Sequence, residues 1–239
     1  MEKYPVLLDI HTHSLASGHG SVDTINAMAK SASKVPLKIL GISDHGPATS
    51  ASCKSSYFRN LTLAPRKRFG VSLLYGIELN ILNQKGDVDL PDDVLESLDY
   101  AFISMHKPLY SPGSADENTL AYIRAMEHPK VHFIGHADDG KFPVDFKALL
   151  YAAKARRVYP EINNRSLMPC SYRKNSYVNS LHLLSLCKKM DFPILLSSDS
   201  HRASQVGNMD YIIPALEKTA FPPKLIINSN LPLLHQILQ

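Results

Sequence analysis

More than half of the eleven histidines in this chain follow short apolar runs. Such runs, bounded by turn residues, are typical of buried parallel strands, and in a barrel the C-terminal ends of those strands meet over one mouth. Neutral imidazoles gathered there with carboxylates are ligands for divalent transition metals. The sequence therefore predicts a metal site built from strand ends. The histidines in these positions are His11, His13, His45, His106, His136 and His201.

The spacing inside two of these segments strengthens the interpretation. A lone histidine after a strand is more often a hydrogen-bonded structural residue than a ligand. Segment 11–13, however, is His-Thr-His, and residues i and i+2 of an extended segment point the same way, so both rings can reach one ion. Asp199 and His201 repeat this spacing. Glu78 ends the apolar run 71–78, where a buried carboxylate is costly unless it is paired or bound to a metal.

Two further residues stay open on spacing alone. Asp44 precedes His45, and it would either orient a metal ligand from behind or cap a turn or helix. His19 is flanked by glycines in a loop, and the sequence is compatible with both a ligand and a structural residue there. We expect the remaining histidines to be structural or solvent-exposed. They are His128, His132, His182 and His235.

Strand and helix patterns alternate along the chain. The strand candidates are 6–10, 38–43, 71–78, 100–105, 132–135, 158–162 and 193–197, with a weaker one at 224–227. The helix candidates are 24–33, 91–97, 119–127, 145–156, 177–190, 209–218 and 232–238.

This alternation predicts a parallel sheet. About seven strand-helix units without a glycine-rich nucleotide loop favour a barrel over an open sheet. The expected fold is α/β, a distorted TIM-like (β/α)7 barrel. Asp23 and Asp145 are the expected start signals of two helices, and 48–56 and 110–117 are expected to be rim loops.

Length and composition favour a single domain over residues 1–239, because 44% apolar residues can bury a full core. Lysine and arginine outnumber the acidic residues by 26 to 22, which favours an anionic partner without requiring nucleic acid. The three cysteines lack paired spacing and are expected to be free thiols in a reducing compartment. We see no signal peptide and no run of membrane-spanning length, and therefore expect a soluble cytoplasmic protein.

The chain also contains, in order and over nearly its whole length, the segments HTHSLASGHG, GISDHGP, GIELN, SMHKP, GHADD, EINN and SSDSH. Together they resemble the PHP (polymerase and histidinol phosphatase) family, and within it the YcdX-type subgroup. Nine positions match the metal ligands of that subgroup: His11, His13, His19, His45, Glu78, His106, His136, Asp199 and His201.

The resemblance implies a distorted seven-stranded barrel and a centre of three divalent ions. These are usually zinc, although manganese or iron can occupy related sites. The resemblance also implies that His19 is a ligand. By carry-over, one ion would be held by His11, His13, Glu78 and Asp199, a second by Glu78, His106 and His136, and the third by His19, His45 and His201. Glu78 would bridge the first two.

The chain departs from the subgroup after His136. It reads Ala-Asp-Asp-Gly over 137–140, where relatives typically have a proline or glycine-rich turn. This predicts a more acidic rim and leaves the identity of the substrate open.

The expected chemistry follows from charge. Three divalent ions on seven imidazoles and two carboxylates leave a cationic pocket, which suits a phosphate dianion. A water shared between the ions would lose a proton near neutral pH and attack phosphorus. We therefore predict a phosphoesterase for small phosphorylated substrates. The residues on which catalysis should depend are Glu78, Asp199 and Asp44.

Four residues at strand ends are candidates to bind the substrate. Arg165 and Lys107 would grip its phosphate, and Asn163 and Asn164 would face the pocket. Surface cations and turn amides are equally compatible with these positions.

Two other classes of function stay open. An amidohydrolase also begins its barrel with His-x-His, but a bridging lysine would favour it, and Glu78 takes the bridging role here. A non-catalytic metal or phosphate binder is the other. Basic clusters at 66–68 and 154–157 lack interleaved aromatic residues, so nucleic acid is not the expected partner. The sequence does not indicate an oligomeric state.

Overall fold

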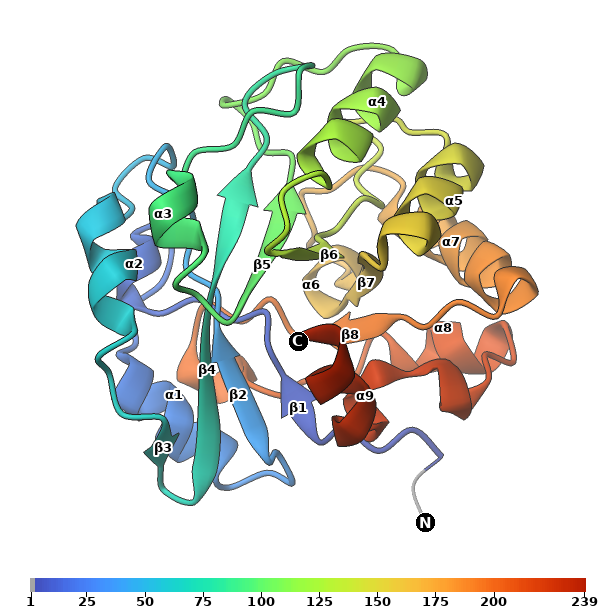
Figure 1. The fold of residues 1–239 in the computed structure, drawn as a ribbon. Helices are drawn as coiled ribbons and strands as arrows, with labels where there is room; N and C mark the ends of the chain where they lie inside the picture. Colours follow the sequence, from blue (N-terminus) through green and yellow to red (C-terminus); the bar gives the residue numbers. More distant parts are fainter. Residues whose placement is uncertain (1–2) are drawn as a thin grey trace.

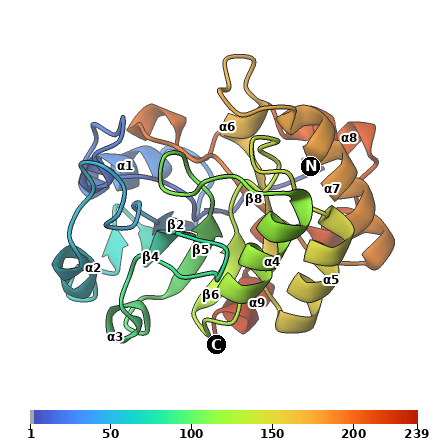
Figure 2. The same ribbon diagram turned by 90° about the horizontal axis from the view of Figure 1, so that it is seen from above.

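The computed structural model describes residues 3–239. Seven parallel strands pair in chain order, and helices surround them (Figures 1 and 2). The strands are β1 (Leu8–Asp9), β2 (Ile39–Ile42), β4 (Val71–Asn80), β5 (Tyr100–Ser104), β6 (Val131–Ile134), β7 (Tyr159–Asn163) and β8 (Leu195–Ser197). A short β3 (Lys67–Arg68) pairs antiparallel with β4.

The sheet curls until its two ends almost meet. Beyond β1 and β8, Thr12 and Ser200 form a parallel bridge, and the N–H of His13 donates to the carbonyl of Ser200 at 2.8 Å. Asn228 also links β1 to β8 within the strands themselves, because its amide donates to the carbonyls of Leu8 and Leu196. The fold is thus the expected distorted, nearly closed barrel.

The helices are α1 (Ile25–Ala32), α2 (Ser55–Leu61), α3 (Asp92–Leu95), α4 (Ala115–Ala125), α5 (Phe146–Arg156), α6 (Asn164–Leu167), α7 (Ser176–Met190), α8 (Ile213–Lys218) and α9 (Leu231–Ile237). None of the helices within residues 3–239 is both long and apolar enough to cross a membrane.

The interior of the barrel is filled by large side chains below the strand ends. Tyr100 and Phe102 point inward from β5, and Phe133 and Leu8 join them in one buried cluster. Gly41 leaves room for this packing, because a Cβ there would lie 2.3 Å from the Tyr100 hydroxyl oxygen. Because the barrel is filled, a site is expected above the C-terminal ends of the strands.

The predicted strands agree with the structure except at 224–227. That segment forms two short 3-10 turns, Pro223–Leu225 and Ile227–Ser229, and only Ile226 makes a bridge, to Ile194. The pairing with β8 is limited to Ile194, whose N–H donates to the carbonyl of Leu225 and whose carbonyl accepts the N–H of Ile227.

Several helix boundaries also differ from the prediction. Thr24 rather than Asp23 caps α1, and the Asp23 carboxylate instead accepts the N–H of Ala203. Helix α4 begins within the segment predicted as a loop, because Ser114 and Glu117 form a capping box.

Helices α2 and α6 were not predicted, and α2 begins within the expected rim loop at 48–56. Asp145 caps α5 as predicted: its carboxylate accepts the N–H groups of Lys147 and Ala148.

Candidate metal centre

The nine candidate ligands gather at the C-terminal ends of the strands. Glu78 lies within β4, and the others follow β1, β2, β5, β6 and β8, or the 3-10 turn Leu15–Ser17 in the case of His19. In each of three groups of residues, the donor atoms lie within 4.8 Å of one another. The groups are His13, His45 and His201; His11, His13 and Glu78; and His45, Glu78 and His106.

Glu78 is the centre of this cluster, and its side chain is only 1% exposed. Its Oε2 lies 2.8 Å from Nδ1 of His45, 3.3 Å from Nε2 of His11 and 3.5 Å from Nε2 of His13. One carboxylate oxygen therefore faces three imidazoles.

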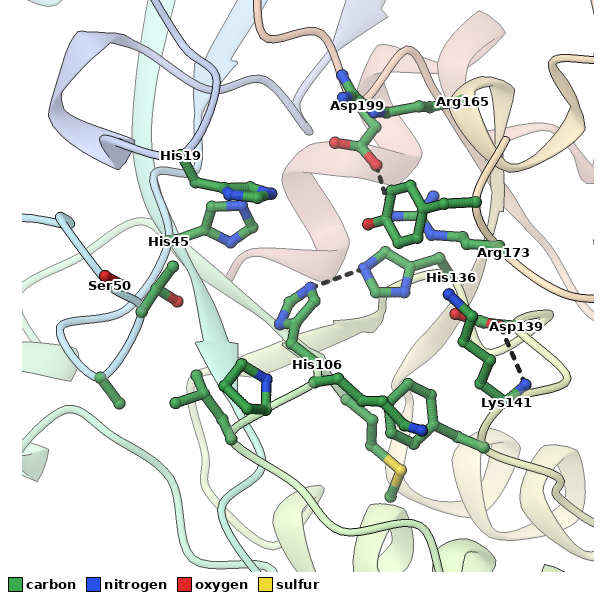
Figure 3. A pocket seen from close by; sticks show the side chains of 18 of the residues that line it. His19, His45, Ser50, His106, His136, Asp139, Lys141, Arg165, Arg173 and Asp199 are labelled. Atoms are coloured by element: carbon green, nitrogen blue, oxygen red, sulfur yellow. Dashed lines mark hydrogen bonds and ion pairs between the residues drawn. The ribbon is translucent and has the colours of Figure 1, made fainter. Parts of the chain in front are cut away.

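The second oxygen of Glu78 faces another pair of rings. Its Oε1 lies 2.8 Å from Nε2 of His136 and 3.3 Å from Nε2 of His106. These two nitrogens are 3.2 Å apart (Figure 3). The two oxygens thus face different groups of imidazoles, which is the geometry expected of a bridging carboxylate.

Asp199 and His201 complete the cluster on the β8 side. Oδ1 of Asp199 lies 3.3 Å from Nε2 of His13, and the rings of His13 and His201 are 4.3 Å apart between centroids. His19 lies further out, with its ring 5.7 Å from that of His45 and 6.0 Å from that of His201. The distances bring all nine residues together but do not divide them into three separate sets.

Several buried imidazole nitrogens in this cluster make no hydrogen bond of suitable geometry among the described residues, although some of them lie close to a carboxylate oxygen. These nitrogens are Nε2 of His11, His13, His45 and His201, together with Nδ1 of His45. A buried polar atom left unpaired costs about 1–3 kcal/mol. Because these nitrogens surround the carboxylates of Glu78 and Asp199, the donor set fits divalent metal ions.

The pKa shifts support the same conclusion. Burial, together with the neighbouring histidines, holds the pKa of His13 well below its usual range, and burial lowers the pKa of His106 and of His201 to about 4. Burial raises the pKa of Glu78, but the surrounding histidines, His11 first, outweigh it and hold this pKa well below its usual range. Neutral imidazoles and an ionised carboxylate are the forms that bind metals.

His11 is an instructive exception. Burial lowers its pKa, but the carboxylates of Glu161 and Glu78 outweigh burial and raise the pKa of His11 well above its usual range. The two carboxylates thus favour a positive charge at this point, and a bound cation would provide one.

Two of the histidines, His11 and His106, are oriented through their other ring nitrogen. Nδ1 of His11 lies 2.6 Å from Oε1 of Glu161, on β7. Nδ1 of His106 lies 2.7 Å from Oδ1 of Asn80, and the Asn80 amide donates to Oδ2 of Asp89 at 2.6 Å. Such contacts fix which nitrogen faces the cluster. Sequence reasoning missed Glu161, Asn80 and Asp89 in these roles.

Asp44 is linked through the hydroxyl of Ser17 to the ring of His13 and to the backbone N–H of His45. Nδ1 of His13 lies 3.1 Å from Oγ of Ser17, and this hydroxyl donates to Oδ1 of Asp44 at 2.7 Å. The hydroxyl of Tyr57 donates to the other oxygen of Asp44 at 2.5 Å. Asp44 also accepts the backbone N–H of Ser14, the residue that caps the 3-10 turn Leu15–Ser17, so its contacts fit both of the roles left open for it.

A cavity of about 560 Å³ opens above the cluster (Figure 3). Two of the four candidate substrate-binding residues, Arg165 and Lys107, line it. Nη1 of Arg165 lies 3.1 Å from Nδ1 of His201, which places the guanidinium beside the ligands. Lys107 is exposed on the cavity wall.

The two asparagines do not line this cavity, contrary to prediction. Asn163 is buried, and its amide donates to Glu161 and to Asp199, at 3.1 Å in both cases. Asn164 turns away from the cluster, since its Oδ1 accepts the N–H of Tyr211. Both amides therefore serve the structure of the rim.

Arg173 was not singled out from the sequence, yet it lines the cavity while its side chain is 4% exposed. Its Nη2 lies 2.8 Å from Oδ2 of Asp199, and its Nη1 donates to Oδ1 of Asn163 at 3.0 Å. Burial raises the pKa of Asp199, but Arg173 is the first of the groups that outweigh it and hold this pKa well below its usual range.

The predicted acidic rim is not present as such. Asp138 is buried and accepts from the hydroxyls of Ser166 and Ser180, and burial raises its pKa to about 6. Asp139 lines the cavity, but its Oδ1 accepts the backbone N–H groups of Lys141 and Lys174. These carboxylates stabilise the loop after β6 instead of forming an exposed acidic surface.

Known proteins resemble this chain over most of its length. A probable phosphatase of Clostridium novyi is 39% identical over 224 residues, which cover 94% of this chain and 91% of the relative. One of Caldicellulosiruptor bescii is 35% identical over 94% of this chain and 92% of its own length.

A crystal structure of histidinol phosphate phosphatase from Lactococcus lactis, complexed with zinc, L-histidinol and phosphate, superposes with a TM-score of 0.63. Its sequence identity is 18%, and the match covers 90% of this chain and 94% of the other. The similarity supports the barrel fold. Residues 9–218, which include every candidate ligand, also match the family model of the PHP domain. The fold, the donor set and this match agree, and the chain belongs to the PHP domain family.

Proposed function

We propose that the protein is a metal-dependent phosphatase that hydrolyses small phosphomonoesters and holds three divalent ions, with zinc as the first candidate and manganese or iron as alternatives. The observation that carries the proposal is the convergence of unpartnered imidazole nitrogens around Glu78, at the base of a cavity lined by arginine and lysine. The relatives named probable phosphatases support the same reaction.

The proposed ligand sets are those carried over from the family. Donor distances support Glu78 as the residue shared between His11 and His13 on one side and His106 and His136 on the other. Bound there, the ions would act as Lewis acids toward the phosphoryl oxygens and would lower the pKa of a water molecule.

The side chains of the chain itself position the substrate. Arg165 lies beside His201 at the cluster and is the proposed partner of the phosphate oxygens. Arg173 keeps Asp199 ionised and aimed at His13. In the net reaction, water adds to phosphorus, the bond from phosphorus to the ester oxygen breaks, and a proton ends on the leaving alcohol.

The test uses the full chain loaded with zinc or manganese. We expect up to three ions per chain by elemental analysis, rapid hydrolysis of p-nitrophenyl phosphate and slower hydrolysis of bis(p-nitrophenyl) phosphate. Activity should disappear with a strong chelator and return when metal is added back.

Each other outcome points to a different function. Hydrolysis of p-nitroacetanilide without phosphatase activity would favour the amidohydrolase alternative. Bound metal without any turnover would favour a binding protein. Absence of metal after gentle purification would remove the basis of the proposal.

A further inference from the structure

The cavity above the cluster is larger than a phosphate group requires. One water molecule needs about 10–15 Å³ of such space, so a phosphate fills only a minor part of the 560 Å³. Beyond the ions and their water, space remains for the leaving group. The side chains that line this remaining space indicate what that group is.

The lining of the cavity combines apolar surface with cations. Leu109, Phe142 and Tyr172 contribute to it together with Lys107 and Lys141. The Lys141 ammonium nitrogen lies 4.7 Å from the centre of the Tyr172 ring. Figure 3 shows Lys141 and Arg173 on the side of the cavity opposite Ser50 and His45.

The four cations of the lining differ in how they are engaged. Arg173 is committed to Asp199, and Arg165 lies against His201. Within residues 3–239, neither Lys107 nor Lys141 forms an ion pair with a carboxylate. These two ammonium groups are therefore available to a ligand.

The lining carries four cations and two carboxylates. Asp199 is paired with Arg173, and Asp139 accepts the backbone N–H groups of Lys141 and Lys174. With both carboxylates counted as negative, the cations still exceed them by two, and Lys107 and Lys141 give the lining its net positive charge. An ammonium group on the leaving group would be repelled here, whereas a carboxylate or a second phosphate would be attracted.

We propose that the substrate is a phosphomonoester whose leaving group carries a second anionic group, bound by Lys107 and Lys141, with its apolar part against Tyr172 and Phe142. The inference rests on the proposed phosphatase function. It adds a charge requirement at the end of the substrate that is remote from the reacting phosphorus.

The test compares three aryl phosphates that differ only in a distal group. They are 3-(4-phosphonooxyphenyl)propionate, 4-ethylphenyl phosphate and O-phosphotyramine, which are anionic, neutral and cationic at that end. The two methylenes insulate the reacting oxygen, so intrinsic reactivity stays nearly constant. We expect kcat/KM to be about tenfold higher for the anionic than for the neutral ester, the ratio for one charge-assisted contact, and lowest for the cationic ester.

The variants assign this preference to the two lysines. Lys107→Gln and Lys141→Gln should each raise KM for the anionic ester more than for the neutral ester, with little change in kcat, so the preference for the anionic ester should fall. Lys→Arg at the same positions should keep the preference. Lys147→Gln, at an exposed position of α5 outside the cavity, is the matched control.

Equal kcat/KM for the anionic and neutral esters, or a preference that survives the double Lys→Gln variant, would overturn the inference while leaving the phosphatase intact. Binding of the dephosphorylated compounds, measured by calorimetry, separates the two proposals. If no ester is hydrolysed, the phosphatase proposal fails. The inferred binding of an anionic group by Lys107 and Lys141 then still requires that 3-(4-hydroxyphenyl)propionate binds more tightly than tyramine.

Discussion

Glu161 connects two candidate ligands that belong to different strands. Its Oε1 lies 2.6 Å from Nδ1 of His11, and its Oε2 accepts the backbone N–H of His136 at 2.7 Å. His136 has a φ of 21°, a region that residues other than glycine rarely occupy. The Glu161 carboxylate thus fixes one imidazole and holds a strained backbone at the other, which is the role expected of a residue that preorganises a metal site.

Glu161→Gln should therefore weaken metal binding without removing a ligand. The amide keeps the shape, but an NH2 group would replace an acceptor and face His11 or the N–H of His136. We expect the metal affinity to fall about 10 to 100-fold, the usual cost of losing such a partner. Competition with a chromophoric chelator measures it. Glu127→Gln, at a side chain that is 66% exposed, is the control, and unchanged affinity in Glu161→Gln would contradict the role.

Glu78 and Asp44 should differ in the size of their effects. Glu78→Gln removes the charge shared by five imidazoles, so turnover should fall by more than the roughly 100-fold that bounds the loss of an orienting residue. Asp44→Asn acts on His13 only through Ser17 and should show the milder effect. Metal content and kcat measured side by side decide the ranking. Equal losses in the two variants would show that Glu78 does not bridge ions.

Histidine placement after apolar runs predicted the fold and the cluster well, for a physical reason. A buried parallel strand must be apolar over several residues, so each run marked its own strand end, and the barrel brings these ends together. His19 could not be found this way, because it lies in a loop after a 3-10 turn. Only the family resemblance pointed to it.

The residues that orient the ligands were harder to predict. Asn80, at the end of β4, contacts His106 across the rim, and Asp89 holds Asn80 from the following loop. Arg173 follows α6 in a segment without hydrophobic periodicity, and only the tertiary fold brings it to Asp199. The asparagines at 163 and 164 were misassigned because position at a strand end does not show whether an amide faces the cavity or a neighbouring loop.

A pH-dependent stability prediction concerns His132, on β6 at the end of the barrel away from the cluster. Burial lowers its pKa to about 4, against an ordinary value of 6.5. Above pH 6.5 the residue is neutral in both the folded and the unfolded chain, so it does not change the free energy of unfolding. As the pH falls toward 4, only the unfolded chain takes up the proton, so folding should lose up to about 3 kcal/mol.

His132→Gln should remove this part of the pH dependence. Urea unfolding of metal-free protein between pH 7 and pH 4 measures it, because metal release would otherwise overlap in the same range. The wild-type free energy of unfolding should fall more steeply than that of the variant over this interval. Parallel curves would show that His132 does not titrate as its burial indicates.

Arg165 provides a test of substrate binding that leaves the metal ligands in place. Its guanidinium lies beside His201 in the cavity and is only partly buried, so Arg165→Ala should not unfold the protein. If it holds the phosphate equally in the ground state and the transition state, KM for a phosphomonoester should rise about tenfold or more while kcat changes less. Arg165→Lys should recover only part of the loss, because lysine cannot make the bidentate contact.

The neighbouring Arg202→Ala, at an exposed position, is the control for this prediction. A fall in kcat with unchanged KM would instead mean that Arg165 acts only in the transition state, and the proposed ground-state grip would be wrong.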